Sequence, residues 1–137
     1  MMLEALALNM SVPVEPALIE GLPTREVRIA FHGEEQVCTG PLLADVVARL
    51  GAPSGSAVRG EALLMAVVVE ARDGYRVAFT LGELDPLLGK APVVLADRCN
   101  GAMLGEADGP FRLAVEGDTR GARSVRQVLS LRLARFE

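Results

Sequence analysis

The chain has 137 residues, of which 50% are apolar and 23% are charged, a balance typical of one globular domain with a single core. No apolar run approaches the roughly 18 residues that a membrane-spanning helix requires. The net charge of −4 is unevenly spread, since the segment from Arg112 onward carries six arginines and only three acidic residues.

This charge distribution favours a small anionic ligand over nucleic acid, because a mildly basic C-terminal segment follows an acidic body of 111 residues. Four phenylalanines, one tyrosine and no tryptophan also leave few aromatic platforms on which bases could stack. We therefore expect neither nucleic-acid binding nor a membrane span.

The N-terminal stretch MMLEALALNM has no basic residue and carries Glu4 inside its apolar part, so it does not resemble a signal peptide. We expect a cytoplasmic protein; the alternative is a periplasmic one whose signal was removed upstream. Residues 2–8 predict a first strand, which Pro13 and Pro16 confine to a sheet edge. Residues 17–22 predict one helical turn.

Residues 24–31 alternate apolar and polar side chains and predict a strand, followed by a turn at His32 and a return strand over 35–39. His32 is interpreted as an exposed turn residue rather than a catalytic base, because no nucleophile motif accompanies it. Residues 41–50 predict the main helix, with a proline in its first turn and an apolar stripe at spacings of three and four.

The centre of the chain predicts a β-hairpin. Residues 65–70 form an apolar, β-branched run and residues 75–80 alternate, while the dipeptide Asp73-Gly74 between them is a strong turn signal. A short helical turn ending at Pro86 follows. Further strands are predicted over 91–96, 111–115 and 127–136, with a linker-like segment over 52–60 and a second hairpin turn at Asn100-Gly101.

These elements predict a single α+β domain over residues 1–137, with one main helix packed on the sheet. The predicted core joins strand residues to the helix stripe: Val67, Val69, Val77, Phe79, Val93 and Leu95 are expected to face Leu43, Val46, Val47 and Leu50. Alternation leaves the orientation of Val68 and Val94 open.

Cys38 and Cys99 are isolated in the sequence, without a CxxC spacing or a cluster of histidines. Two cysteines permit one disulfide, but no pattern brings these two together. We expect both to be reduced, structural residues that coordinate no metal. A zinc site built from side chains is not expected either, since it needs about four ligands at close spacing.

Four stretches in series resemble the oxidoreductase molybdopterin-binding domain of the sulfite oxidase type, and its small bacterial members most closely. They read TGPLLADVV, VVVEARDGYRVAFTLGELDP, VLADRCNGAML and GPFRLAVEGDTRGARSVRQVLSLRL. The resemblance spans roughly residues 31–133. It implies a barrel-like domain of mixed β-sheet that cradles a molybdenum–pterin cofactor. Neither Cys38 nor Cys99 stands in the sequence context of the family's molybdenum-ligating cysteine, and the chain is shorter than the complete domain of the large enzymes.

The resemblance also implies a cofactor-binding segment near the end of the chain. Relatives carry Gly-x-Arg-x-Val-Lys there, and this chain reads Gly121-Ala122-Arg123-Ser124-Val125-Arg126. We predict a weak phosphate or sulfate site centred on Arg123 and Arg126, with Ser124 as a hydroxyl donor, provided that residues 124–126 form a helical turn. The alternative is a solvated basic turn beside the last strand.

Three functions remain open at this point. The first, which we favour, is a binding module or accessory protein that holds a pterin, the molybdenum cofactor or another small anion without performing redox chemistry. The second is a small molybdopterin-dependent oxidoreductase with Cys38 or Cys99 as an unorthodox metal ligand. The third is a scaffold or partner subunit that binds another protein and no small ligand.

Overall fold

The computed structural model describes residues 9–31 and 33–136. Within them the chain forms ten strands: β1 (Ser11–Pro13), β2 (Arg25–Phe31), β3 (Glu34–Gly40), β4 (Met65–Ala71), β5 (Arg76–Thr80), β6 (Val93–Ala96), β7 (Arg98–Cys99), β8 (Ala102–Met103), β9 (Arg112–Val115) and β10 (Val128–Arg135). The helices are α1 (Pro16–Ile19), α2 (Leu43–Arg49) and α3 (Leu81–Leu84), with 3-10 turns η1 (Gly55–Ala57), η2 (Gly60–Leu64) and η3 (Gly121–Arg123). The structure is an α+β domain, as predicted.

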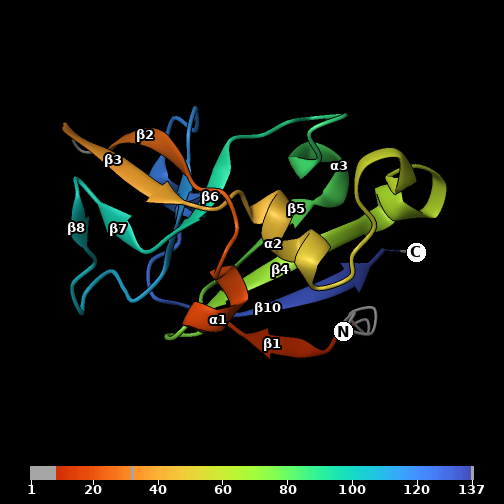
Figure 1. The fold of residues 1–137 in the computed structure, drawn as a ribbon, viewed down its shortest axis with the longest axis horizontal. Helices are drawn as coiled ribbons and strands as arrows, with labels where there is room; N and C mark the ends of the chain where they lie inside the picture. The colour runs from red at the N-terminus through yellow and green to blue at the C-terminus, as the bar shows by residue number, and fades with distance from the viewer. Residues whose placement is uncertain (1–8, 32, 137) are drawn as a thin grey trace.

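The strands form three antiparallel sheets (Figure 1). The largest has the order β1–β10–β4–β5, the second has the order β2–β3–β7–β8, and β6 pairs with β9. The β6–β9 pair lies beside the end of β3, where the Leu95 amide donates to the Pro41 carbonyl at 2.9 Å and the Asp97 amide donates to the Thr39 carbonyl at 3.3 Å. A Cβ atom at Gly40 would overlap the Leu95 carbonyl oxygen, so this crossing requires glycine.

The central hairpin is confirmed. Strands β4 and β5 pair with Val67 opposite Phe79 and Val69 opposite Val77. Gly74 in the turn has φ +90°, a conformation that favours glycine. The helical turn after β5 is α3, and a capping box between Thr80 and Glu83 begins it.

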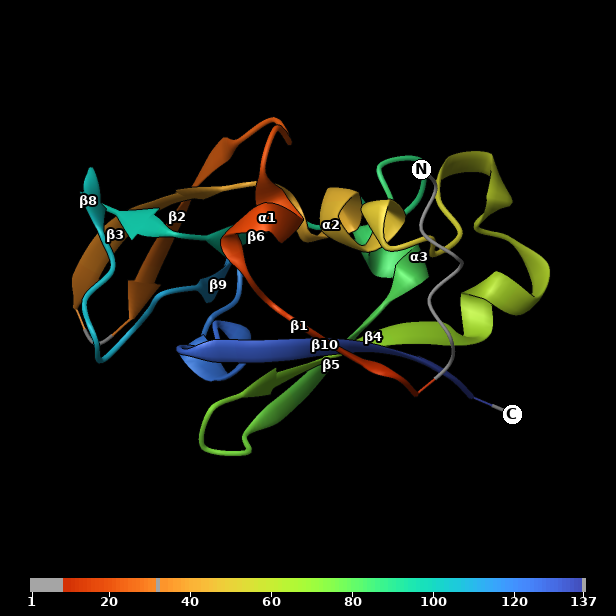
Figure 2. The same ribbon diagram turned by 60° about the horizontal axis from the view of Figure 1, so that its bottom comes forward.

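The main helix and its core partners are confirmed as well. Helix α2 ends at Arg49, with Leu50 as its C-cap before Gly51, and it lies with α3 on one face of the β1–β10–β4–β5 sheet (Figure 2). The predicted strand residues join the helix stripe in one apolar cluster, although Val77 is only partly buried. Val94 points instead into a smaller cluster beneath the second sheet.

Some expected details differ from the structure. Strand β10 has a register irregularity between Val128 and Ser130, which leaves Leu129 exposed and buries Ser130, so its simple alternation is broken. Residues 60–64, which follow the predicted linker-like segment and for which we predicted no element, form the 3-10 turn η2. The predicted strand over 2–8 and the turn residue His32 lie outside the described residues.

The expectation that both cysteines are reduced is wrong. Cys38 and Cys99 form a disulfide with a Cα–Cα distance of 4.0 Å. The two residues are directly opposite each other where β3 pairs with β7, so the antiparallel register brings their side chains together.

No helix among the described residues is long and apolar enough to cross a membrane.

Candidate functional site

The C-terminal basic segment forms its turn earlier than predicted. The 3-10 turn η3 spans Gly121–Arg123, whereas Ser124 has φ −84° and ψ +67° and leaves the helical conformation. The expectation of a helical turn over residues 124–126 is therefore wrong. The Ser124 hydroxyl is buried and accepts a hydrogen bond from the Val115 amide at 3.1 Å, which ties this segment to β9.

Arg123, one of the two predicted anion ligands, is held by acidic side chains. Its Nε and Nη2 atoms donate to the two carboxylate oxygens of Asp118 at 3.0 and 2.9 Å, and Nη1 donates to Glu83 at 3.1 Å. The guanidinium also lies 4.9 Å from the ring centre of Phe79. The hydrogen bonds to Asp118, followed by those to Glu83, raise the pKa of Arg123 above its ordinary value. Two carboxylates already surround one guanidinium here, and their net negative charge disfavours the binding of a further anion.

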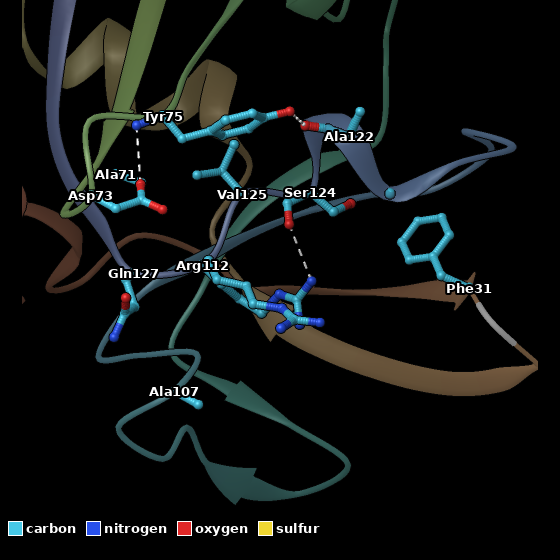
Figure 3. A pocket seen from close by; sticks show the side chains of 12 residues that line it. Phe31, Ala71, Asp73, Tyr75, Ala107, Arg112, Ala122, Ser124, Val125 and Gln127 are labelled. Carbon is cyan, nitrogen blue, oxygen red and sulfur yellow. Dashed lines mark hydrogen bonds between the residues drawn. The ribbon is translucent and has the colours of Figure 1, made fainter.

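The other predicted residues surround a cavity of about 510 Å³. Gly121, Ser124 and Arg126 are in its lining, and Arg123 is not. The lining comes from the end of β4 and the β4–β5 turn, the end of β2, the loop before β9 and the first residue of β9, and the segment from η3 to β10: Phe31, Ala71, Asp73, Tyr75, Ala107, Arg112, Gly121, Ala122, Ser124, Val125, Arg126 and Gln127. Figure 3 shows how the labelled side chains of this group converge.

Two aromatic residues shape the cavity. The Tyr75 hydroxyl donates to the Ala122 carbonyl at 2.6 Å, which links the β4–β5 turn to η3. Its ring lies over Val125, as Figure 3 shows. Phe31 contacts the backbone at Gly121, where an added Cβ would lie 3.1 Å from the ring. These contacts hold the η3 segment between the β4–β5 turn and the end of β2, which are distant from it in the sequence.

Arg112 is the residue of the site that we did not predict. It is 4% exposed, in a strand whose four residues are all buried. Its Nη2 donates to the Ser124 carbonyl and its Nε to the Leu113 carbonyl, both at 3.2 Å. Among the described residues no carboxylate lies within 4 Å of its guanidinium. Backbone carbonyls are neutral, so they leave the positive charge of this buried guanidinium unpaired. Arg112 can therefore still bind an anion at the cavity wall.

The electrostatic environment of Arg112 follows from its neighbours. Burial lowers the pKa of Arg112, the carboxylate of Asp108 opposes that shift, and the positive charge of Arg126 adds to it. Arg126 is itself paired with Asp108, its Nε 3.3 Å from the carboxylate. Asp108 is therefore the ion-pair partner of Arg126 alone, and it acts on Arg112 only through longer-range electrostatics.

The cofactor that the sequence resemblance implies has a phosphate-bearing pterin and a metal held by a thiolate. Arg112 and Arg126 carry donors of the kind that a phosphate group requires. The disulfide leaves neither Cys38 nor Cys99 as a thiolate for a metal. No group of three or more potential metal-ligating side chains occurs in the part of the chain that the structure describes.

Comparison of the chain with models of known protein families and with curated proteins finds no match in either. The functional interpretation therefore depends on the geometry of the cavity and on the resemblance of the four sequence stretches.

Proposed function

We propose that this chain is a binding module for a small phosphate-bearing ligand, which Arg112 and Arg126 hold in the cavity between η3 and the β4–β5 turn. The observation that supports this most is the buried guanidinium of Arg112, which lines the cavity and contacts only backbone carbonyls. Burying a cation costs free energy unless it is paired, and a ligand phosphate would supply the missing partner. Gly121 and Ser124 remain in the proposed site, while Arg123 is assigned a structural role on Asp118 and Glu83.

The resemblance to the oxidoreductase molybdopterin-binding domain identifies the first ligand to test. A phosphate-bearing pterin combines the anionic group that the two arginines would bind with a ring system that the cavity between Tyr75 and Phe31 would have to accommodate. We propose on the same basis that the three sheets are a reduced form of the sulfite oxidase-type fold.

We propose no redox step for this chain. A molybdenum-dependent oxidoreductase of this type needs a thiolate ligand, and the only cysteines in the sequence, Cys38 and Cys99, bind each other. A binding or accessory role for the molybdopterin part of the cofactor requires no such ligand.

The same disulfide bears on the compartment. Disulfides form and persist in oxidising environments and are rare in the cytosol. Of the two compartments considered from the sequence, we therefore propose the periplasmic one over the cytoplasmic one.

A scaffold or partner-subunit role is the second candidate. It is favoured by an exposed group of leucines beside α3, formed by Leu63, Leu87 and Leu88, of which Leu87 is 68% exposed. Leu63 and Leu88 both lie next to Gly82, where an added Cβ would be 3.4 Å and 3.9 Å from their side chains. Contiguous exposed apolar side chains are typical of protein-binding surfaces.

A phosphate titration followed by backbone amide shifts tests the proposal. We expect the amides of residues 121–126 to shift with phosphate, and the affinity to fall with added salt. Replacing Arg112 with methionine, which keeps an unbranched apolar side chain but removes the guanidinium, should weaken binding about tenfold or more, since a charge-assisted hydrogen bond contributes about 1.5–3 kcal/mol.

Arg123→Met is the matched control, because it removes the same charge outside the cavity; we expect it to change the phosphate affinity less than about twofold. Arg126→Met provides a second variant at the exposed rim if Arg112→Met does not fold. Equal losses in the Arg123 and Arg126 variants would contradict the cavity as the site. Unmoved amides in the unaltered protein would instead support the scaffold role.

A further inference from the structure

The loop between β8 and β9 is held rigidly beside the proposed anion site. The Gln127 amide donates to the Asp108 carbonyl at 2.8 Å, and the Gln127 side-chain amide donates to the Glu106 carbonyl at 2.6 Å. Gln127 makes both hydrogen bonds with φ +51°, a backbone conformation that is uncommon for residues other than glycine. The loop therefore presents Asp108 at a defined place.

Asp108 carries the only carboxylate that the described structure pairs with a cavity arginine. Its Oδ1 atom lies 3.3 Å from the Nε of Arg126. The Asp108 side chain is 32% exposed, so part of its interaction with the site takes place away from bulk water. The two arginines carry two positive charges, and the carboxylates of Asp108 and of Asp73, which also lines the cavity, balance them. Neutralising one carboxylate would therefore leave the site with a net positive charge.

We infer that Asp108 is an intramolecular competitor for the anion, and that it lowers the affinity of the cavity more for doubly charged ligands than for singly charged ones. This inference rests on the proposed anion site at Arg112 and Arg126. An anion on Arg126 either displaces the Asp108 carboxylate or binds beside it. When it binds beside Asp108, the two negative charges repel each other in proportion to the charge of the ligand.

The charge dependence distinguishes this role from simple blocking of the cavity. Neutralising Asp108 removes a repulsion energy that is twice as large for a dianion as for a monoanion. The fold increase in affinity for the dianion is therefore the square of the fold increase for the monoanion. At a partly exposed position we expect a gain of about threefold for a monoanion and about tenfold for a dianion. A steric block would give equal gains for ligands of similar size.

The test compares methyl phosphate with dimethyl phosphate at pH 8, where the first is a dianion and the second a monoanion. Both are titrated against the full chain and its Asp108→Asn variant, with the amides of residues 121–126 as the readout. We expect the variant to bind methyl phosphate about tenfold and dimethyl phosphate about threefold more tightly than the unaltered protein. Asp108→Ser is the second variant if the asparagine disturbs the loop.

Asp97→Asn is the matched control. Asp97 is also 32% exposed and also contacts a single arginine Nε, that of Arg98 at 3.5 Å, but neither residue lines the cavity. Equal gains for the two esters, no gain, or the same gain in the Asp97 variant would overturn the competitor role while leaving the anion site in place. Failure of every variant to bind either ester would overturn the proposed function and this inference together.

Discussion

Replacing Phe79 with alanine should lower the free energy of unfolding by about 3–5 kcal/mol, the range for deleting a fully buried aromatic side chain. Phe79 has no exposed surface and is one of the largest buried side chains of the described structure. It stands on β5 opposite Val67 and belongs to the cluster that joins the sheet to α2. Chemical denaturation of the two proteins, followed by circular dichroism, measures the loss.

Phe136→Ala is the control for this prediction, because Phe136 is 54% exposed at the end of the chain and should lose less than about 1 kcal/mol. Phe79→Leu isolates the contact with Arg123, since leucine fills much of the same space without an aromatic face for the guanidinium. A loss below about 1 kcal/mol for Phe79→Ala would mean that this side chain is not in the core.

The second large effect is expected at the disulfide. Removing it by the double substitution Cys38→Ala/Cys99→Ala should lower the free energy of unfolding by about 2–4 kcal/mol, because the crosslink restricts a long loop of the unfolded chain. The two cysteines are 61 residues apart in sequence. The paired register between β3 and β7 covers only two residue pairs, so we expect amide exchange to quicken most in β7 and β8.

Thiol titration in denaturant checks the crosslink itself. Protein purified from an oxidising compartment should show no reactive thiol before reduction and two after it. The matched control is Cys38→Ala alone, which leaves one free thiol and should match the double variant in stability to within about 1 kcal/mol. Two reactive thiols in the unreduced, unaltered protein would contradict the disulfide.

Local patterns were sufficient for most of the secondary structure. The turn at Asp73-Gly74, the apolar stripe of 41–50 and the alternation of 24–31 each depend on near neighbours in the sequence, and each produced the predicted element. The core partners of Phe79 followed from these elements, since a helix stripe must pack against the apolar face of a sheet. Strand β10 departed from prediction at its irregularity near Ser130, which alternation does not reveal.

The candidate site depended much more on distant contacts. The sequence predicts an anion site at Gly121, Arg123, Ser124 and Arg126, and all of these except Arg123 line one cavity. It does not distinguish Arg123, which Asp118 and Glu83 bind, from Arg126, which remains at the cavity. The sequence does contain one indication of Arg112, because it is the one charged residue in the apolar run FRLAV. The alternation of side chains along a strand nevertheless predicts that such a residue faces the solvent.

The sequence by itself determined the α+β class, the central hairpin, the main helix and the core around Phe79, because these follow from the spacing of side chains along a few neighbouring turns or strands. Three features follow only from the tertiary structure: the disulfide between Cys38 and Cys99, the burial of Arg112 at a cavity wall, and the ion pairs of Arg123 with two carboxylates. Each of these features depends on which strands become neighbours and in what register. Cys38 and Cys99 are 61 residues apart and Glu83 and Arg123 are 40 apart, so no local sequence pattern predicts these contacts.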